Sequence, residues 1–282
     1  MRIVITGGLG QLGQALQDVL VDHDLLIVDL PETDITDREA MEAVIQGANA
    51  EVVIHCAAYT DVDDCARNPD LAYKINALGT QNVVLSCEKF GAELVHISTN
   101  EVFAGNRAEG YEEWMPLDPI NAYGRSKAIA ETFVRNLTNR YYIIRTAWLY
   151  APGGRNFIHA IIAKARTVGE VRVVADEIAN PTYVKDLANA VARVIQTGQY
   201  GTYHFANAGA CSRWAFANEI LRLAGLDQVR NIPILGREYG RASTPPPFAA
   251  LHNIAGAAIG ITLRPWQEAL LEYMETHPPA DS

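Results

Sequence analysis

The chain has 282 residues, of which 49% are hydrophobic and 20% charged, and its formal net charge is −10. This is the composition of an ordinary globular protein with enough apolar residues for a substantial core. The acidic balance disfavours nucleic acids and anionic membrane surfaces as partners, and no apolar run reaches the roughly 20 residues that span a bilayer.

The N-terminal sequence and the cysteines indicate where the protein is located, and the spacing of the cysteines and histidines indicates whether it binds a metal. The opening sequence MRIVITGG has no charged-then-apolar leader of the kind that is cleaved on secretion. The four cysteines lack C-x-x-C spacing, and the seven histidines form no H-x-x-x-H pair. We therefore expect reduced, mostly buried thiols in a cytoplasmic protein without a metal site.

Apolar runs alternate with helical patterns in the first half of the chain. The helical spacing of apolar residues occurs at 11–22, 37–47 and 71–91. Nearly continuous hydrophobicity, typical of strands buried on both faces of a parallel sheet, occurs at 2–6, 25–29, 51–57, 93–98 and 141–146. The alternation predicts an α/β fold with a doubly wound parallel sheet of Rossmann type.

The pattern loosens after about residue 150. We expect helices at 155–168, 184–197, 212–224 and 265–276, short strands near 171–174, 203–206 and 231–235, and a proline-rich loop at 241–253. The predicted organisation is a dinucleotide-binding domain at 1–150, with its sheet completed by a segment near 171–205. Residues 151–282 would mainly form a smaller substrate-binding lobe, interleaved with the first domain at the carboxyl edge of the sheet.

A glycine-rich loop, TGGLGQLG (6–13), follows the first predicted strand and opens the first predicted helix. In this context Gly7 can supply a tight turn, Gly10 can let the backbone approach a pyrophosphate, and Gly13 can let helix and strand pack closely. The helix N-terminus would offer unpaired N–H groups to the phosphates. The alternative is a purely structural turn, since glycines often mark strand–helix junctions.

An acidic residue, Asp29, ends the second predicted strand 16 residues after Gly13. A carboxylate there can bind the ribose hydroxyls of an adenosine, and it repels a 2′-phosphate. Because Leu30, Pro31 and Glu32 supply no basic side chain, the charge favours NAD(H) over NADP(H). The alternative role for Asp29 is a helix or turn cap.

Three polar residues, Thr99, Tyr123 and Lys127, could form one proton-transfer device. Thr99 leaves the fourth predicted strand at the sheet edge where doubly wound folds bind ligands. Tyr123 and Lys127 lie four residues apart, on one face of a predicted helix. An ammonium such as Lys127, together with an oxidised nicotinamide ring, favours the phenolate and would lower the tyrosine pKa. The alternatives are a capping threonine and a solvated Tyr–Lys pair.

In these motifs the sequence resembles the extended short-chain dehydrogenase/reductase superfamily, and within it the dTDP-4-dehydrorhamnose reductases. The resemblance covers essentially the whole chain. It rests on TGGLGQLG, STNEVF, YGRSK, CAAYTDVDDCARNP (56–69), RTAWLYAPGGRNF (145–157), DEIANPTYVKDLA (176–188) and LRPWQEAL (263–270).

The resemblance implies reduction of the C4 ketone of dTDP-4-dehydro-L-rhamnose with NAD(P)H. Tyr123 would protonate the C4 oxygen, Thr99 would orient the carbonyl, and Lys127 would bind the nicotinamide ribose. The implied cofactor-binding residues are Gly7, Gly10, Gln11, Leu12, Gly13, Asp29, Asp34, Ile35, Ala57, Ala58, Tyr59, Tyr123 and Lys127. The implied substrate-binding residues are Val62, Asn100, Glu101, Trp148 and Asn156. For Trp148 the alternative is a purely structural role in core packing.

The sequence departs from the family pattern at three places. Members usually read S-T-D-Y-V-F, and their tyrosine approaches the sugar where this chain has Glu101. A common R-P pair aligns with Pro245 and Pro246, and Arg241 is a possible substitute for the arginine. Some members form a magnesium-bridged dimer through a glutamate at the position of Ala15, so we expect a monomer, or a homodimer without that bridge.

Two other functions stay open at this point. One is another nucleotide-sugar reductase, epimerase or dehydratase of the same superfamily. The other is a non-catalytic protein like the regulatory subunit of methionine adenosyltransferase.

Overall fold

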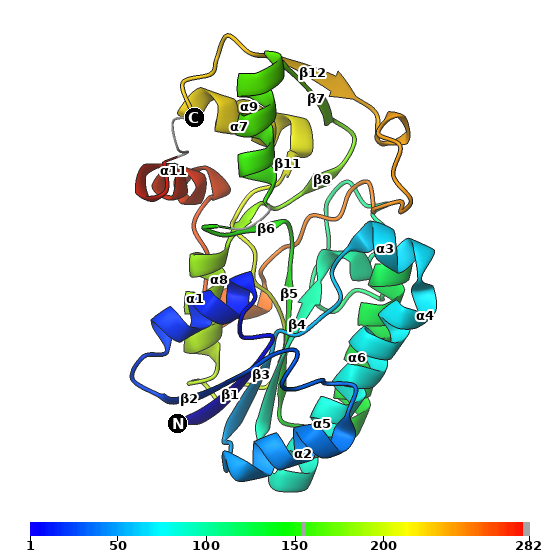
Figure 1. Ribbon diagram of the computed structural model, residues 1–282, viewed down its shortest axis with the longest axis vertical. Helices are drawn as coiled ribbons and strands as arrows, with labels where there is room; N and C mark the ends of the chain where they lie inside the picture. Colours follow the sequence, from blue (N-terminus) through cyan, green and yellow to red (C-terminus); the bar gives the residue numbers. More distant parts are fainter. Residues whose placement is uncertain (154–155, 279–282) are drawn as a thin grey trace.

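A six-stranded parallel sheet forms the centre of the computed structural model, which describes residues 1–153 and 156–278 (Figure 1). The strand order is β10-β5-β4-β3-β1-β2, and every neighbouring pair is parallel. The strands are β1 (Arg2–Thr6), β2 (Asp24–Val28), β3 (Val52–His55), β4 (Glu93–Thr99), β5 (Tyr141–Thr146) and β10 (Gly201–His204). The predicted fold class and the five N-terminal strands are confirmed.

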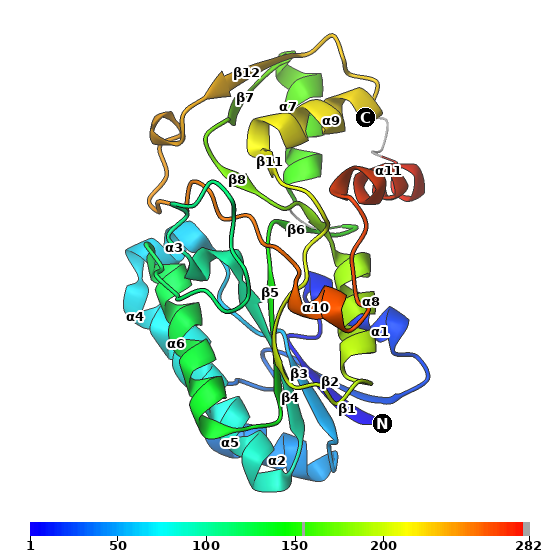
Figure 2. The same cartoon turned by 180° about the vertical axis from the view of Figure 1, so that it is seen from behind.

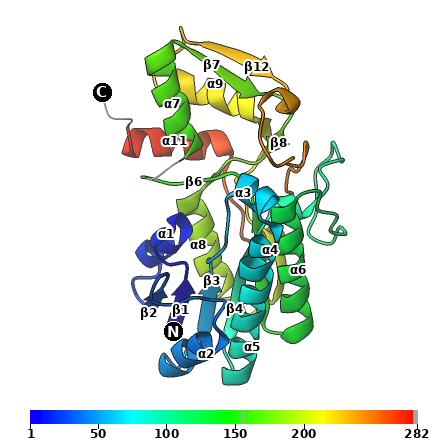
Figure 3. The ribbon, with the colours of Figure 1, turned by 45° about the vertical axis from the view of Figure 1, so that its right-hand side comes forward.

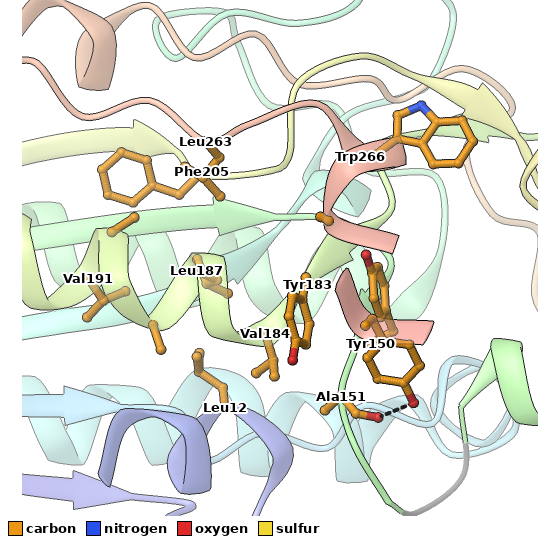
Figure 4. Packing of buried hydrophobic residues seen from close by; sticks show 14 of the residues in the cluster. Leu12, Tyr150, Ala151, Tyr183, Val184, Leu187, Val191, Phe205, Leu263 and Trp266 are labelled. Atoms are coloured by element: carbon orange, nitrogen blue, oxygen red, sulfur yellow. Dashed lines mark hydrogen bonds between the residues drawn. The ribbon is translucent and has the colours of Figure 1, made fainter. Parts of the chain in front are cut away.

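Helices cover both faces of this sheet (Figure 3). One face carries α1 (Gln11–Val19) and α8 (Val184–Val194), and the other carries α2 (Arg38–Gly47), α5 (Thr80–Phe90) and α6 (Ala122–Leu137). Successive side chains of a strand point to opposite faces, so Ile3 and Ile5 of β1 join one core cluster while Val4 joins the other. In Figure 4, Leu12 of α1 points toward Val184 and Leu187 of α8.

The helix predicted at 71–91 is divided into three parts. They are α4 (Pro69–Ala72), the π-helical segment η1 (Tyr73–Gly79) and α5. The side chain of Asn76 in η1 exchanges hydrogen bonds with the backbone of Tyr59, accepting from its nitrogen at 2.7 Å and donating to its oxygen at 3.0 Å. A π-helical turn inside a helix often marks a functional site, and this one fixes the loop that follows β3.

A smaller lobe lies beyond the carboxyl ends of the strands (Figure 2). Its main elements are α7 (Phe157–Val168), β7 (Glu170–Val174), α9 (Arg213–Leu223), β12 (Arg230–Ile234) and α11 (Trp266–Thr276). The shorter elements of the chain are α3 (Val62–Arg67), η2 (Asn100–Val102), β6 (Leu149–Tyr150), β8 (Ile178–Ala179), β9 (Thr182–Tyr183), β11 (Cys211–Ser212), η3 (Gly236–Glu238) and α10 (Ala255–Ala258).

Two strands from the second half of the chain, β10 and β7, belong to different sheets. The strand expected near 203–206 is β10, which completes the main sheet beside β5, whereas β7 pairs with β12 in the smaller lobe. The first residue of the helix predicted at 155–168, and residues 154–155 of the RTAWLYAPGGRNF motif, lie outside the described residues. The division of the chain at residue 150 stays a prediction. No helix within the described residues is long and apolar enough to cross a membrane.

Candidate active site

The loop between β1 and α1 requires glycine at two positions. Gly7 has a φ of +66°, and a Cβ atom on it would lie 2.6 Å from the backbone nitrogen of Ala57. A Cβ atom on Gly13 would lie 2.5 Å from the carbonyl oxygen of Gly7. The Gly10 N–H donates to that same oxygen at 3.1 Å and tightens the turn. The first turn of α1 contains no acidic residue, so its N–H groups are suited to an anion.

Asp29 joins the end of β2 to this loop. Its carboxylate accepts hydrogen bonds from the backbone nitrogen of Leu9 at 2.9 Å and from that of Leu30 at 2.8 Å. The side chain therefore has the capping contacts that the sequence left open as an alternative. It also lines the cavity described next, so both roles are compatible.

A cavity of about 790 Å³ follows the carboxyl ends of the central strands. In the sheet, β2 and β3 lie on opposite sides of β1, so the strand order reverses there. Doubly wound sheets bind ligands in the crevice at the carboxyl ends of the strands at such a reversal. The residues predicted from the sequence that line it are Gly7, Gly10, Gln11, Leu12, Gly13, Asp29, Asp34, Ile35, Ala57, Ala58, Tyr59, Val62, Thr99, Asn100, Glu101, Tyr123, Lys127 and Trp148.

Asn156 is the predicted site residue that the structure does not bring to this cavity. It is the N-cap of α7, and its side-chain oxygen accepts from the His159 backbone nitrogen at 2.9 Å. Its amide nitrogen donates to the Ala151 carbonyl at 2.8 Å and to the Tyr273 hydroxyl at 3.2 Å. The side chain is thus occupied in holding a helix start, and the substrate-binding role expected for it has no support from its position.

Tyr123 and Thr99 both line this cavity. Tyr123 lies in the first turn of α6, which Asn121 caps by accepting from the Gly124 nitrogen at 2.7 Å. Thr99 ends β4, and its hydroxyl is hydrogen-bonded to the Tyr123 hydroxyl. Burial raises the pKa of Tyr123, and the Glu101 carboxylate raises it further, while the hydrogen bond with Thr99 opposes both. The phenol is therefore protonated at neutral pH.

Lys127 lies one turn after Tyr123 and is almost completely buried. Its ammonium group donates to the Ile97 carbonyl of β4 at 2.7 Å. Burial lowers the pKa of Lys127 to about 8, although Glu131 and Cys56 act in the opposite direction. The prediction that Lys127 lowers the pKa of Tyr123 is wrong for this structure. Lys127 is not among the groups that shift the tyrosine, because its ammonium is directed to the strand carbonyl and burial dominates the phenol.

Comparison with known proteins places this geometry in a family. The family described as RmlD substrate binding domain matches residues 1–277. The chain belongs to the dTDP-4-dehydrorhamnose reductase family. It is 36% identical over 281 residues to the spore coat polysaccharide biosynthesis protein SpsK of Bacillus subtilis, covering 99% of each chain. It is 38% identical over 275 residues to the dTDP-4-dehydrorhamnose reductase of Mycolicibacterium smegmatis, covering 95% of this chain and 84% of the relative.

A solved member of the reductase family has the same fold over its whole length. The crystal structure of dTDP-4-dehydrorhamnose reductase from Bacillus anthracis in complex with NADP is 41% identical to this chain, with a TM-score of 0.94. The match covers 98% of this chain and 99% of that one.

In this member of the reductase family, a second cavity of about 230 Å³ adjoins the first. The two share Val62, Asn100, Glu101, Trp148 and Arg213 as lining residues. The second cavity is also lined by Glu177, Arg241 and the neighbouring prolines of the 241–253 loop. The substrate-binding residues expected near Trp148 therefore extend into a compartment that both halves of the chain line, with Asp61 and Asp63 on one side and Glu177, Arg213 and Arg241 on the other.

Arg213 is a residue of this compartment that the sequence reasoning missed. Its guanidinium lies 4.0 Å from the centre of the Trp148 ring, and its Nε atom lies 3.6 Å from Glu177. Burial lowers the pKa of Arg213 to about 10. A usable signal was present, because Arg213 opens α9, and a cation at a helix N-terminus is electrostatically unfavourable unless another interaction compensates it.

Arg241 also reaches this compartment, as the sequence departure at Pro245 and Pro246 suggested. It forms an ion pair with Glu177, and its guanidinium packs over the Tyr239 ring at 5.5 Å from the ring centre. The cavity thus contains two guanidinium groups, Arg213 and Arg241, that share the carboxylate of Glu177.

Proposed function

We propose that this protein reduces the C4 ketone of dTDP-4-dehydro-L-rhamnose to give dTDP-L-rhamnose, with a reduced nicotinamide dinucleotide as the electron donor. The observation that carries the proposal is that Thr99, Tyr123 and Lys127 line the same cavity as the glycine loop. The reductases from Mycolicibacterium smegmatis and Bacillus anthracis, at 38% and 41% identity, support the substrate assignment.

The residues of the cavity fit a dinucleotide. The glycine loop leaves no room for a Cβ atom at Gly7, and the N-terminus of α1 faces the same space, which suits a pyrophosphate. Asp29 would hold the adenosine ribose, and Lys127 would hold the ribose beside the nicotinamide. When bound, the reduced nicotinamide supplies the hydride that the carbonyl carbon accepts.

The choice between NADH and NADPH is a finer proposal. The Bacillus anthracis relative was solved with NADP, which supports a nicotinamide dinucleotide as the class of cofactor. The slight preference for NADH rests on the charge of Asp29, because a carboxylate at that place repels a 2′-phosphate.

Tyr123 would act as the general acid. As the carbonyl carbon is reduced, negative charge develops on the C4 oxygen, and the phenolic proton moves to it. A high pKa does not prevent this step, because a sugar alkoxide is a stronger base than a phenolate. The phenol is in the protonated form that the reduction consumes, and because its raised pKa makes it a weaker acid, the transfer depends on the strong basicity of the developing alkoxide.

Thr99 and Lys127 would prepare that proton transfer. The Thr99 hydroxyl can donate to the carbonyl oxygen from the same side as Tyr123, which fixes the ketone before charge develops. The Lys127 ammonium, held by the Ile97 carbonyl, would bind the ribose beside the nicotinamide and so place the ring next to the ketone.

The second cavity would hold the nucleotide part of the substrate. Arg213 and Arg241 are the cations that line it, and guanidinium groups bind phosphate oxygens with two parallel hydrogen bonds. Arg241 lies four residues before Pro245, so it would replace the arginine that this chain lacks in the family's R-P pair.

The test is the substitution Tyr123→Phe in the purified full-length protein. Oxidation of NADH and of NADPH by dTDP-4-dehydro-L-rhamnose is followed by absorbance. We expect kcat to fall at least ~100-fold, as for loss of a general acid, while the dinucleotide still raises the melting temperature. The matched control is Tyr200→Phe, which changes an exposed tyrosine paired with Glu93. Wild-type protein that oxidises neither cofactor would exclude the proposed reaction, and an unchanged kcat in Tyr123→Phe would exclude the assigned acid.

The same preparation tests the alternatives predicted from the sequence. An epimerase or dehydratase would keep NAD bound through purification, and a non-catalytic subunit would co-purify with a synthetase without turnover. The UDP-glucose 4-epimerase of Thermus thermophilus shares the fold at 22% identity, which shows no more than the fold. A monomer, or a homodimer without a magnesium bridge, stays a prediction.

A further inference from the structure

Glu101 lines the dinucleotide cavity, but the proposed ketone reduction assigns it no role. It lies in η2, two residues after Thr99, and it lines both the dinucleotide cavity and the second cavity. Reduction needs a proton donor for the ketone oxygen and a hydride for the ketone carbon. Tyr123 and the dinucleotide supply these, so a partly buried carboxylate beside them requires another explanation.

The backbone nitrogen and the carbonyl oxygen of Glu101 each contact a residue at or beside the catalytic groups. Its nitrogen donates to the Thr99 hydroxyl at 3.2 Å, so the Glu101 turn and the Thr99 side chain hold one another. Its carbonyl oxygen packs directly against Gly124, where any Cβ atom would collide with it. Gly124 is the neighbour of Tyr123 in the first turn of α6. The position of Glu101 relative to Thr99 and Tyr123 is therefore set by the fold.

One oxygen of the Glu101 carboxylate is free for a ligand. Oε2 accepts from the Asn121 amide at 2.6 Å, whereas no described residue is hydrogen-bonded to Oε1. The positive charges of Arg213 and Arg241 act on the Glu101 carboxylate, but both arginines form their ion pair with Glu177. Burial raises the pKa of Glu101, against the opposing effects of Asn121 and the two arginines, and a carboxylate of raised pKa is the stronger base.

A ketone beside such a carboxylate can do more than accept a hydride. The C–H bonds on the carbons next to the carbonyl are acidic because the electrons left behind move onto the carbonyl oxygen. That oxygen would lie at Thr99 and Tyr123, which are hydrogen-bond donors suited to an enolate. Glu101 would be the base on one side of the ketone, and Thr99 and Tyr123 would be the oxyanion donors on the other. This arrangement is suited to proton abstraction next to a carbonyl.

We propose that Glu101 is a general base that exchanges a proton on a carbon adjacent to the C4 ketone of the bound sugar. The inference rests on the proposed function, because it requires a 4-keto sugar in this cavity. Oε1 takes the proton, the C–H electron pair forms a carbon–carbon double bond, and the carbonyl electron pair moves to the C4 oxygen. The Glu101 carboxyl exchanges that proton with solvent, and transfer of a solvent-derived proton from the carboxyl to the same carbon restores the ketone. The step consumes no oxidant or reductant.

Deuterium exchange tests this activity separately from reduction. Full-length protein is incubated in deuterium oxide with dTDP-4-dehydro-L-rhamnose and the oxidised dinucleotide, which cannot donate hydride. Deuterium in the recovered sugar is located by NMR and quantified by mass spectrometry, and an enzyme-free sample gives the spontaneous rate. Reduction by NADH and NADPH is measured on the same preparations.

We expect the wild-type protein to accelerate exchange at a carbon next to the ketone. The Glu101→Gln variant should exchange at least ~100-fold more slowly, in the range for loss of a general base. The control is Glu219→Gln, which makes the same chemical change in a carboxylate that pairs with Arg222 on α9, and it should match the wild type.

The outcomes separate the two proposals. Reduction without accelerated exchange would overturn the inference and leave the proposed function intact. Exchange that is equally fast in Glu101→Gln and the wild type would remove Glu101 as the base. Absence of both reduction and exchange would overturn the proposed function, and the inference with it.

Discussion

The substitution Glu131→Gln tests how the fold holds the active-site helix in place. Glu131 lies one turn after Lys127 in α6, and its side chain is fully buried. Arg145 of β5, which is 1% exposed, donates to both carboxylate oxygens at 2.9 and 2.8 Å. Ser98, the neighbour of Thr99, donates to the same carboxylate at 2.6 Å. The carboxylate therefore connects the helix of Tyr123 and Lys127 to the two central strands beside it.

The magnitude follows from what the substitution leaves behind. Glutamine keeps the shape of Glu131 but removes its charge, so the buried Arg145 guanidinium loses its counter-ion. Removing one partner of a buried ion pair costs about 3–5 kcal/mol. Arg145 keeps a hydrogen bond to the Glu113 carbonyl at 3.1 Å, so we expect a loss near the lower end of that range.

Urea unfolding of the purified protein at neutral pH measures this loss. Glu42→Gln is the matched control, because Glu42 forms its ion pairs with Arg38 and Lys89 on the exposed surface and should leave the urea midpoint nearly unchanged. If Glu131→Gln and Glu42→Gln shift the midpoint equally, Glu131 does not hold α6 in the manner described.

The pH dependence gives an independent check. Burial by itself would raise the pKa of Glu131, but the hydrogen bonds and charge of Arg145, with Arg135 and Ser98, lower it to about 2 from an ordinary value of 4.5. The stabilisation is therefore complete above pH 4.5 and is lost as the pH falls from 4.5 to 2. The difference in unfolding free energy between wild type and Glu131→Gln should shrink over this interval. A constant difference would contradict the assignment.

Three further predictions concern the site itself. The pKa of Lys127 is lowered to about 8, so kcat should fall as the pH rises through that value and the ammonium is lost, which a pH profile of kcat measures. Gly7→Ala places a Cβ atom 2.6 Å from the Ala57 nitrogen, so the dinucleotide should no longer raise the melting temperature; an undiminished rise would show that the loop is not its binding site. Arg213→Met removes a cation from the second cavity and should raise KM at least ~10-fold with a smaller change in kcat, in line with loss of one charged hydrogen bond to the substrate. A lower kcat at unchanged KM would place Arg213 in the chemical step instead.

The sheet could be predicted because its signals are local. The strands β1 to β5 are continuous apolar runs, and such runs identify buried parallel strands without knowledge of their neighbours. The interruption of the helix predicted at 71–91 could not be seen in the same way. Residues 73–79 contain no proline and have ordinary helical spacing. The π-helical geometry is accompanied by the contacts of Asn76 with Tyr59, which belong to a distant loop.

The site residues could also be predicted only where a short stretch of sequence carries the pattern. The glycine loop and the spacing of Tyr123 and Lys127 are short patterns, and the structure brings them to one cavity. The expected depression of the Tyr123 pKa was wrong because spacing along a helix does not reveal where an ammonium points or how deeply a phenol is buried. Asn156 could have been interpreted from its own surroundings, because an asparagine before an apolar helical run is a typical N-cap.

The two cavities divide the work of the site between different parts of the chain. Thr99 and Glu101 come from a single turn at the end of β4, and that turn is packed against Gly124 of α6. Arg213 and Arg241 come from the second half of the sequence, and they meet this turn at the boundary of the second cavity. Under the proposed function the ketone would contact the first group and the nucleotide phosphates would contact the second, so we expect a change at position 101 to alter which bonds at the ketone can react. We expect a change at position 213 or 241 to alter which nucleotide sugar is held there.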